Sequence, residues 1–205
     1  MLSSDAENFY WLSRYVERAE NTAKLVNVNI ELLLDFVGNK SEGWKPVIEI
    51  TGMKDFFQKK YKTFNEINSV KFLSQDTDNN NSILSCLEKA QYNARPIRDN
   101  LPRSSIHQLN VLLKNFNDQI KSTTSRRKRT LIISEVTSGT QLFFGIISDN
   151  FSLGTEYQFI KLGRFIERAD MVSRIIDSQI LRKNQDGVLS LIHISEPTRQ
   201  EAISY

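Results

Sequence analysis

The sequence contains few of the residues that build disulfides and metal sites. Its 205 residues include one cysteine, Cys86, and two histidines, His107 and His193. A single cysteine cannot form an internal disulfide, and in a helical pattern it is usually a small core residue. The chain also has no His-rich metal site, no Gly-rich phosphate loop and no Ser-His or Cys-His arrangement suited to nucleophilic catalysis. We therefore expect no metal and no cofactor.

Long hydrophobic runs are also absent. A membrane-spanning helix needs roughly 20 apolar residues, whereas the longest clearly apolar run extends only from Leu142 to Ile147. The N-terminus has no basic stretch leading into an apolar one, which argues against a secretory signal. These absences predict a cytoplasmic protein with no membrane segment and no membrane partner.

Positive charge is in modest excess. The net charge of +3 is too small to indicate a nucleic-acid partner by itself. Four consecutive basic residues at 126–129 stand where a loop meets an expected helix, and no aromatic residue interleaves them. The favoured interpretation is a solvated helix face, with phosphate contact as the alternative, so nucleic acid is not an expected partner.

What the sequence does contain is helical periodicity. Apolar residues recur at steps of three and four from Leu12 to Leu33, which predicts an amphipathic helix over residues 5–36. Pro96 is expected to bend a later helix that continues to Ile97, and Pro102 to occupy the first turn of the next. We expect an all-α fold, a bundle-like array of long antiparallel amphipathic helices. The further expected helices cover residues 44–51, 54–61, 66–73, 82–97, 102–120, 125–149 and 153–183.

The most informative signal is an internal repeat. The nine residues from Leu12 to Glu20 match those from Leu162 to Asp170 at a constant offset of 150, and basic and apolar positions continue to correspond beyond them. At about 100° per residue, the polar residues of each copy fall on one side of a helix. We call these sets the N-terminal ridge and the C-terminal ridge. They comprise Arg14, Glu17, Arg18 and Asn21, and Arg164, Glu167 and Arg168.

Two interpretations of the ridges remain open. In the first, Arg14 with Glu17 and Arg164 with Glu167 are intrahelical i,i+3 salt bridges, each worth a few tenths of a kcal/mol. In the second, each ridge faces another helix or a cleft, where a carboxylate held between guanidinium groups belongs to a binding pocket. Two further candidate arginines, Arg95 and Arg98, lie three residues apart and could join that pocket.

These residues resemble the alpha-E family, described as a predicted alpha-helical domain with a conserved Glu-Arg motif. The family motif falls on Glu17-Arg18 and on Glu167-Arg168. The resemblance implies a bacterial protein with no established activity, typically encoded beside ATP-grasp and transglutaminase-like proteins. The residues that carry it are Met1–Ser3, Ala6–Leu12, Arg14-Tyr15, Glu17–Ala23, Ser82-Ile83, Asn93–Arg95, Arg98-Asp99, Leu162–Arg164 and Glu167–Ala169.

The last residues have a different character. Residues 189–205 resemble the translation of a sequencing adapter, and the alternative is a genuine C-terminal extension. Family members generally continue beyond this point. We therefore expect residues 1–188 to be the N-terminal part of an alpha-E helical domain and residues 189–205 to be a non-native tail.

The resemblance and the ridges lead to two hypotheses. In the first, the chain is an accessory or scaffold component that binds an ATP-grasp-type protein, and its ridges recognise that partner, a peptide or an anionic ligand. Such a chain would not be an enzyme itself. In the alternative, Glu17 or Glu167 is a general base and the candidate arginines hold an anionic substrate.

Overall fold

The computed structural model describes residues 2–34, 42–123 and 125–183. These residues form eight packed α-helices and two short 3-10 helices, without any strand, which confirms the all-α fold. Their order is α1 (Ser3–Leu32), η1 (Glu42–Trp44), α2 (Lys45–Ile50), α3 (Lys54–Lys60), α4 (Glu66–Ser74), α5 (Ile83–Ala94), η2 (Arg98–Asn100), α6 (Arg103–Ile120), α7 (Arg126–Asn150) and α8 (Thr155–Lys183).

Side-chain caps mark where three of the helices begin. Asn65, Ser82 and Ser125 precede α4, α5 and α7, and each side chain accepts a hydrogen bond from the backbone N–H three residues later. Such a bond satisfies one of the four backbone donors left open at a helix N-terminus. The expected starts near Ser82 and Ser125 are therefore confirmed.

The region around Pro96 differs from the expectation. The sequence predicts a bent helix that continues to Ile97, whereas α5 ends at Ala94 and Pro96 lies in a turn before η2. Proline has no N–H to continue the helical hydrogen-bond series, so here it ends the helix. Pro102 lies immediately before α6, close to its expected first-turn position.

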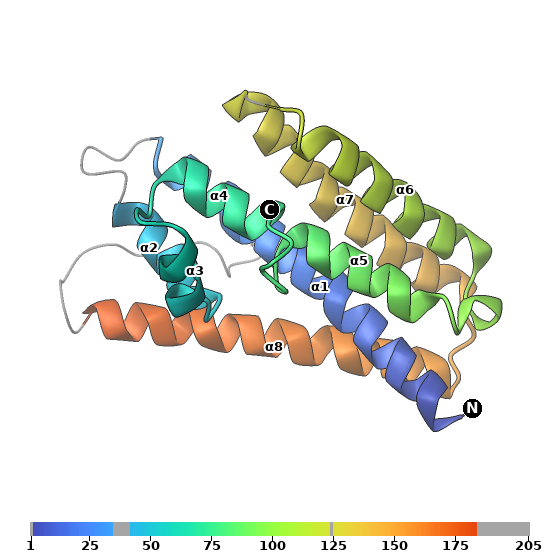
Figure 1. The fold of residues 1–205 in the computed structure, drawn as a ribbon. Helices are drawn as coiled ribbons and strands as arrows, with labels where there is room; N and C mark the ends of the chain where they lie inside the picture. The colour runs from blue at the N-terminus through green and yellow to red at the C-terminus, as the bar shows by residue number, and fades with distance from the viewer. Residues whose placement is uncertain (1, 35–41, 124, 184–205) are drawn as a thin grey trace, which may run out of the picture.

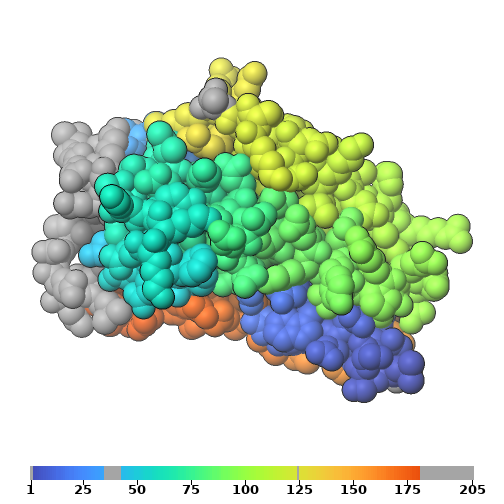
Figure 2. Space-filling view, in the orientation of Figure 1, coloured from blue at the N-terminus to red at the C-terminus, as the bar shows by residue number. Residues whose placement is uncertain are grey.

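Helix α1 lies at the centre of the fold. It packs against α5, α7 and α8, while α6 packs on α7 and α5 (Figure 1). Its buried stripe includes Leu12, Val16, Ala19 and Val26. Figure 2 shows α4, α5 and α6 covering one face, with α8 at the surface along one edge. Helix α8 is thus attached through α1 and α2.

The direction of the helices is mixed. Neighbours such as α6 and α7 run antiparallel, as expected for short connections, but α1 and α8 run in the same direction (Figure 1). Because the repeated segments lie on α1 and α8, corresponding residues of the two copies lie at similar heights along the pair.

Helix α7 is the one described helix that is long and apolar enough to cross a membrane, judged by length and composition alone. No single apolar run in the sequence indicated this. The helix packs between α1 and α6, and its residues Ile133, Val136 and Phe143 are buried there. Since core helices of this kind meet the same criterion, the absence of a membrane segment stays a prediction.

Candidate functional site

The two ridges meet where α1 and α8 cross. Gly163 of α8 lies against α1, and a Cβ atom at this position would overlap Ser13 Oγ and the carbonyl oxygen of Tyr10. Gly163 and Ser13 occupy corresponding positions of the repeat, so a small residue from each copy permits the close approach. The crossing therefore places Glu17 and Glu167 within reach of the opposite helix.

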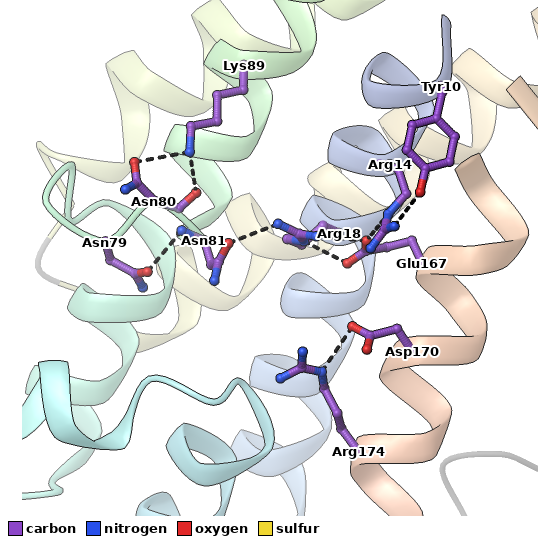
Figure 3. Close-up of polar contacts among 10 residues, drawn as sticks. All are labelled: Tyr10, Arg14, Arg18, Asn79, Asn80, Asn81, Lys89, Glu167, Asp170 and Arg174. Carbon is purple, nitrogen blue, oxygen red and sulfur yellow. Dashed lines mark hydrogen bonds and ion pairs between the residues drawn. The ribbon is translucent and has the colours of Figure 1, made fainter. Parts of the chain in front are cut away.

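Glu167 is held by two arginines of α1. Its Oε2 accepts hydrogen bonds from Arg14 Nε at 2.6 Å and from Arg18 Nη2 at 2.9 Å, and its Oε1 accepts one from Arg18 Nε at 2.6 Å (Figure 3). The Glu167 side chain is only 2% exposed. Both carboxylate oxygens thus have charged donors in a site closed to solvent.

Glu17 is held in the same way by two arginines of α8. Its Oε1 accepts from Arg168 Nε at 2.7 Å, and its Oε2 accepts from Arg164 Nε at 3.1 Å and Arg168 Nη2 at 3.2 Å. Its side chain is 1% exposed. Because the same residues make the same contacts from each side, the cluster has an approximate two-fold symmetry, and we call it the reciprocal cluster.

This geometry corrects the first interpretation of the ridges. In that interpretation Arg14 and Arg164 pair with Glu17 and Glu167 of their own helices, but each instead donates to the glutamate of the other helix. The buried glutamates gain two guanidinium partners each by this exchange, which an i,i+3 pair on a single helix would not supply. Each ridge faces another helix, as the second interpretation expects, whereas the binding pocket of that interpretation stays a prediction.

Aromatic rings lie against Arg14 and Arg164. Arg14 donates to the Tyr10 hydroxyl at 2.6 Å, and the Arg164 guanidinium lies 3.9 Å from the centre of the Phe144 ring. Burial lowers the pKa of Arg14, but hydrogen bonds to Tyr10 and Glu167 outweigh that effect and leave the pKa raised. Arg18 is likewise left with a raised pKa, since bonding to Glu167 outweighs its desolvation. These groups hold their positive charge in the fold.

A loop attaches the reciprocal cluster to α5. Arg18 Nη1 donates to Asn81 Oδ1 at 3.0 Å, and Lys89 of α5 donates to the carbonyl and side-chain oxygens of Asn80 (Figure 3). The side chain of Asn79 in turn accepts the backbone N–H of Asn81 at 2.9 Å. Arg18 therefore links α1 both to α8 and to the start of α5.

The remaining candidate residues do not join the cluster. Arg95 is exposed just after α5 and bonds to Gln91 of that helix, and Arg98 is exposed beside Asp99. In the described part of the chain, no hydrogen bond or ion pair connects either arginine to the ridge glutamates. Asn21 is half-buried, and its amide nitrogen has no hydrogen-bond partner among the described residues.

Sequence reasoning missed three contributors to the site. Tyr10 stands four residues before Arg14, a spacing that places both on one helical face and could have indicated the contact. Phe144 and Asn81 carry no such signal, because they come from α7 and from the loop before α5. Tertiary packing alone brings them to the arginines.

The basic run at 126–129 is partly neutralised. Arg126 and Arg129 both form ion pairs at 3.0 Å with Glu66 at the start of α4. Arg127 and Lys128 are exposed. This pairing agrees with the favoured reading of the run as a helix face, and nucleic-acid binding stays untested.

The chemistry available at the reciprocal cluster is limited. A general base needs a carboxylate oxygen that can reach a substrate proton, whereas Glu17 and Glu167 are closed to solvent and fully engaged by guanidinium donors. In the described ranges, no three His, Cys, Asp or Glu residues gather as a metal site would require. The arrangement is therefore suited to joining two helices.

Comparison with family models matches residues 1–198 to Alpha-E, described as a predicted alpha-helical domain with a conserved ER motif. The chain belongs to the Alpha-E family. Neither the curated proteins nor the solved structures include a match to it. The resemblance places the Alpha-E motif on Glu17-Arg18 and Glu167-Arg168, which are the pairs at the centre of the reciprocal cluster.

The Alpha-E match extends past residue 188 into the segment expected to be foreign. Residues 184–205 lie outside the described part of the chain, so the division at residue 188 stays a prediction. Family membership establishes an Alpha-E domain of unknown function and carries no reaction or partner with it.

Proposed function

We propose that the chain is an accessory or scaffold component acting with ATP-grasp and transglutaminase-like proteins in the synthesis or modification of peptide or amide bonds. The partners come from the resemblance to the Alpha-E family, whose members are typically encoded beside such proteins. The scaffold role is supported by one observation, the complete use of Glu17 and Glu167 in contacts between α1 and α8.

The burial of both glutamates argues for a structural role of the motif. Removing one partner of a buried ion pair typically costs about 3–5 kcal/mol, because the other charge is left uncompensated. A residue used for acid/base chemistry would instead need contact with substrate. The motif thus builds the frame of the domain, and partner recognition falls to other surfaces.

This reading changes the expected role of the ridges. The first hypothesis assigned partner binding to Arg14, Glu17 and their counterparts, but these side chains already bind one another. In the proposed scaffold, Glu17→Gln weakens partner binding only through loss of folded protein. Binding per folded molecule should remain within about twofold of the unchanged chain.

The proposal is tested by co-purification with an ATP-grasp-type protein of the kind encoded beside members of the Alpha-E family. The chain, Glu17→Gln and a control, Glu88→Gln, are compared, with binding normalised to the folded fraction from circular dichroism. Glu88 is exposed on α5 and takes part in none of the ion pairs among the described residues. We expect all three to bind. Absence of binding by the unchanged chain, or ATP-dependent amide formation by the purified chain alone, contradicts the proposal.

A further inference from the structure

Helix α8 presents an exposed apolar strip on the side facing away from α1. Phe165 is 51% exposed and Ile176 is 52% exposed, and Ala169 lies between them in the open. The N-terminal half of the strip forms a shallow groove lined by Phe159, Leu162, Phe165, Ile166 and Ala169, with the polar Gln158 and Lys161 at its edge. We define the strip as Leu162, Phe165, Ile166, Ala169, Val172, Ser173, Ile176 and Ile180, all exposed.

The spacing of the strip is that of a helix–helix contact. Leu162, Phe165, Ala169, Val172 and Ile176 follow one another at steps of three, four, three and four residues. This is the heptad pattern of helices that pack side by side. From Leu162 to Ile180 the strip is about 27 Å long at 1.5 Å per residue, enough for an extended contact.

The repeat shows what such a strip does in this fold. Five residues of the strip have buried equivalents in the first copy of the repeat, 150 positions earlier on α1. Leu162, Ile166, Ala169, Ile176 and Ile180 correspond to Leu12, Val16, Ala19, Val26 and Ile30. Helices α5 and α7 pack on α1. The equivalent surface of α8 is open in the described structure, so its complement is another helical apolar face.

We propose that the strip binds the same strip of a second copy of this chain, forming a two-fold symmetric dimer through antiparallel α8 helices with Ala169 at the axis. In this register Leu162 lies opposite the partner's Ile176, and Ile166 opposite the partner's Val172. Phe165 lies opposite the partner's Ser173, so a large side chain meets a small one. A patch that fits itself in this way is the requirement of a two-fold interface.

The charges around the strip also suit self-pairing. The strip contains no charged side chain, so two copies meet without like-charge repulsion across its centre. The only hydroxyl in it, Ser173, already donates to the carbonyl oxygen of Asp170 at 2.8 Å. Lys161 and Asp177 flank opposite sides of the strip and can remain in solvent.

The oligomeric state in solution tests the dimer. Sedimentation velocity of the chain across a concentration series should show a monomer–dimer equilibrium, and Phe165→Glu should raise the dimer Kd at least about tenfold. The matched control is Leu131→Glu, because Leu131 is 56% exposed on α7, outside the strip. Its dimer Kd should stay within about twofold of that of the unchanged chain.

Cross-linking tests the register. Cys86 is fully buried and is the only native cysteine, so an introduced cysteine is the only accessible thiol. Under mild oxidation Ala169→Cys should form a disulfide-linked dimer, whereas Leu162→Cys should not, because its partner position is Ile176. Efficient cross-linking of Leu162→Cys alone or of both variants overturns the antiparallel register.

Two results would overturn the dimer itself. A monomer at every concentration overturns the dimer, and equal weakening of the dimer by Phe165→Glu and Leu131→Glu shows that α8 does not form the interface. Circular dichroism of each variant confirms that the fold is retained. Because neither measurement involves an ATP-grasp-type protein, failure here leaves the proposed function untouched, and the converse also holds.

Discussion

Arg168 of α8 donates two hydrogen bonds to Glu17 of α1, from Nε at 2.7 Å and from Nη2 at 3.2 Å, across 151 residues of sequence. Arg18 of α1 makes the corresponding pair of bonds to Glu167. Each Glu-Arg motif thus binds the other one. The contribution of these contacts can be measured as a change in the free energy of unfolding.

Replacing a ridge glutamate should destabilise the fold. Glu17→Gln removes the negative charge that compensates Arg164 and Arg168, and we expect a loss of about 3 kcal/mol in the free energy of unfolding. The estimate is at the low end of the range for buried pairs because Arg168 is 43% exposed and can recover hydration. Urea unfolding measures the change. The Glu88→Gln control should stay within about 0.5 kcal/mol, and equal effects of the two would contradict a structural role.

Replacing Glu167 should destabilise the fold more than replacing Glu17. Arg14, a partner of Glu167, is 15% exposed, whereas Arg168, a partner of Glu17, is 43% exposed. A less exposed arginine recovers less hydration when its partner is lost, so Glu167→Gln should destabilise by about 1 kcal/mol more than Glu17→Gln. Parallel urea titrations compare them. The reverse order would mean that the burial of the arginines does not govern the cost.

The crossing of α1 and α8 should tolerate no side chain at position 163. Gly163→Ala introduces a Cβ that overlaps Ser13 Oγ and the Tyr10 carbonyl oxygen, and we expect a loss of about 1–3 kcal/mol. Gly145→Ala is the matched control within α7, since a Cβ there has no neighbour within 4 Å. Because alanine favours a helix over glycine, this control should be stabilising by about 0.5–1 kcal/mol. The melting temperatures of both variants test the opposite signs.

Adding Ser13→Gly to Gly163→Ala extends this test. The double variant removes the overlap with Ser13 Oγ but keeps the one with the Tyr10 carbonyl, and a glycine inside α1 is itself unfavourable, so it should recover stability only in part. Full recovery would place the whole strain on the Ser13 side chain.

The buried cysteine should make stability sensitive to alkaline pH. Burial raises the pKa of Cys86 to about 12. In the unfolded chain the thiol ionises near its ordinary value of about 8.5, so above that pH the unfolded state binds fewer protons than the folded state. This contribution to stability is fully present below about pH 8.5 and is lost as the pH rises towards 12, with a slope of up to about 1.4 kcal/mol per pH unit.

Comparison with Cys86→Ala isolates that slope, because the cavity left by this substitution has a cost that does not depend on pH. Urea unfolding of both proteins between pH 8 and 11 should show a steeper decline in the unchanged chain. Identical slopes would show that Cys86 does not titrate on unfolding. Thiol labelling at pH 8 should likewise be slow in the native protein and fast in urea.

The sequence alone predicts where the long helices lie and that the two ridges are equivalent. The period of the apolar residues marks one face of each helix, and it predicts α1 and α8 to within a few residues at the ends that the structure describes. The offset of 150 identifies Glu17 and Glu167 as equivalent residues from the sequence alone.

Which arginine each glutamate binds could not be deduced in the same way. Arg14 is three residues from Glu17, a spacing that also fits a pair within one helix, and helical periodicity carries no information on the neighbour's direction. The parallel course of α1 and α8 depends on packing across the whole chain. A glycine inside a helix often marks a close approach, but the contact of Gly163 with Ser13 is seen only in the structure.

The separation of Glu17 from Arg164 and Arg168 also has a consequence for synthesis in the cell. At about 5–20 residues per second, a ribosome that has made Glu17 needs roughly 10–30 s before it has made α8. During that interval α1 can already associate with α5 and α7, but its glutamate still lacks both guanidinium partners. Arrival of α8 therefore supplies both guanidinium partners of Glu17, and a nascent chain that stops before residue 164 holds an uncompensated carboxylate.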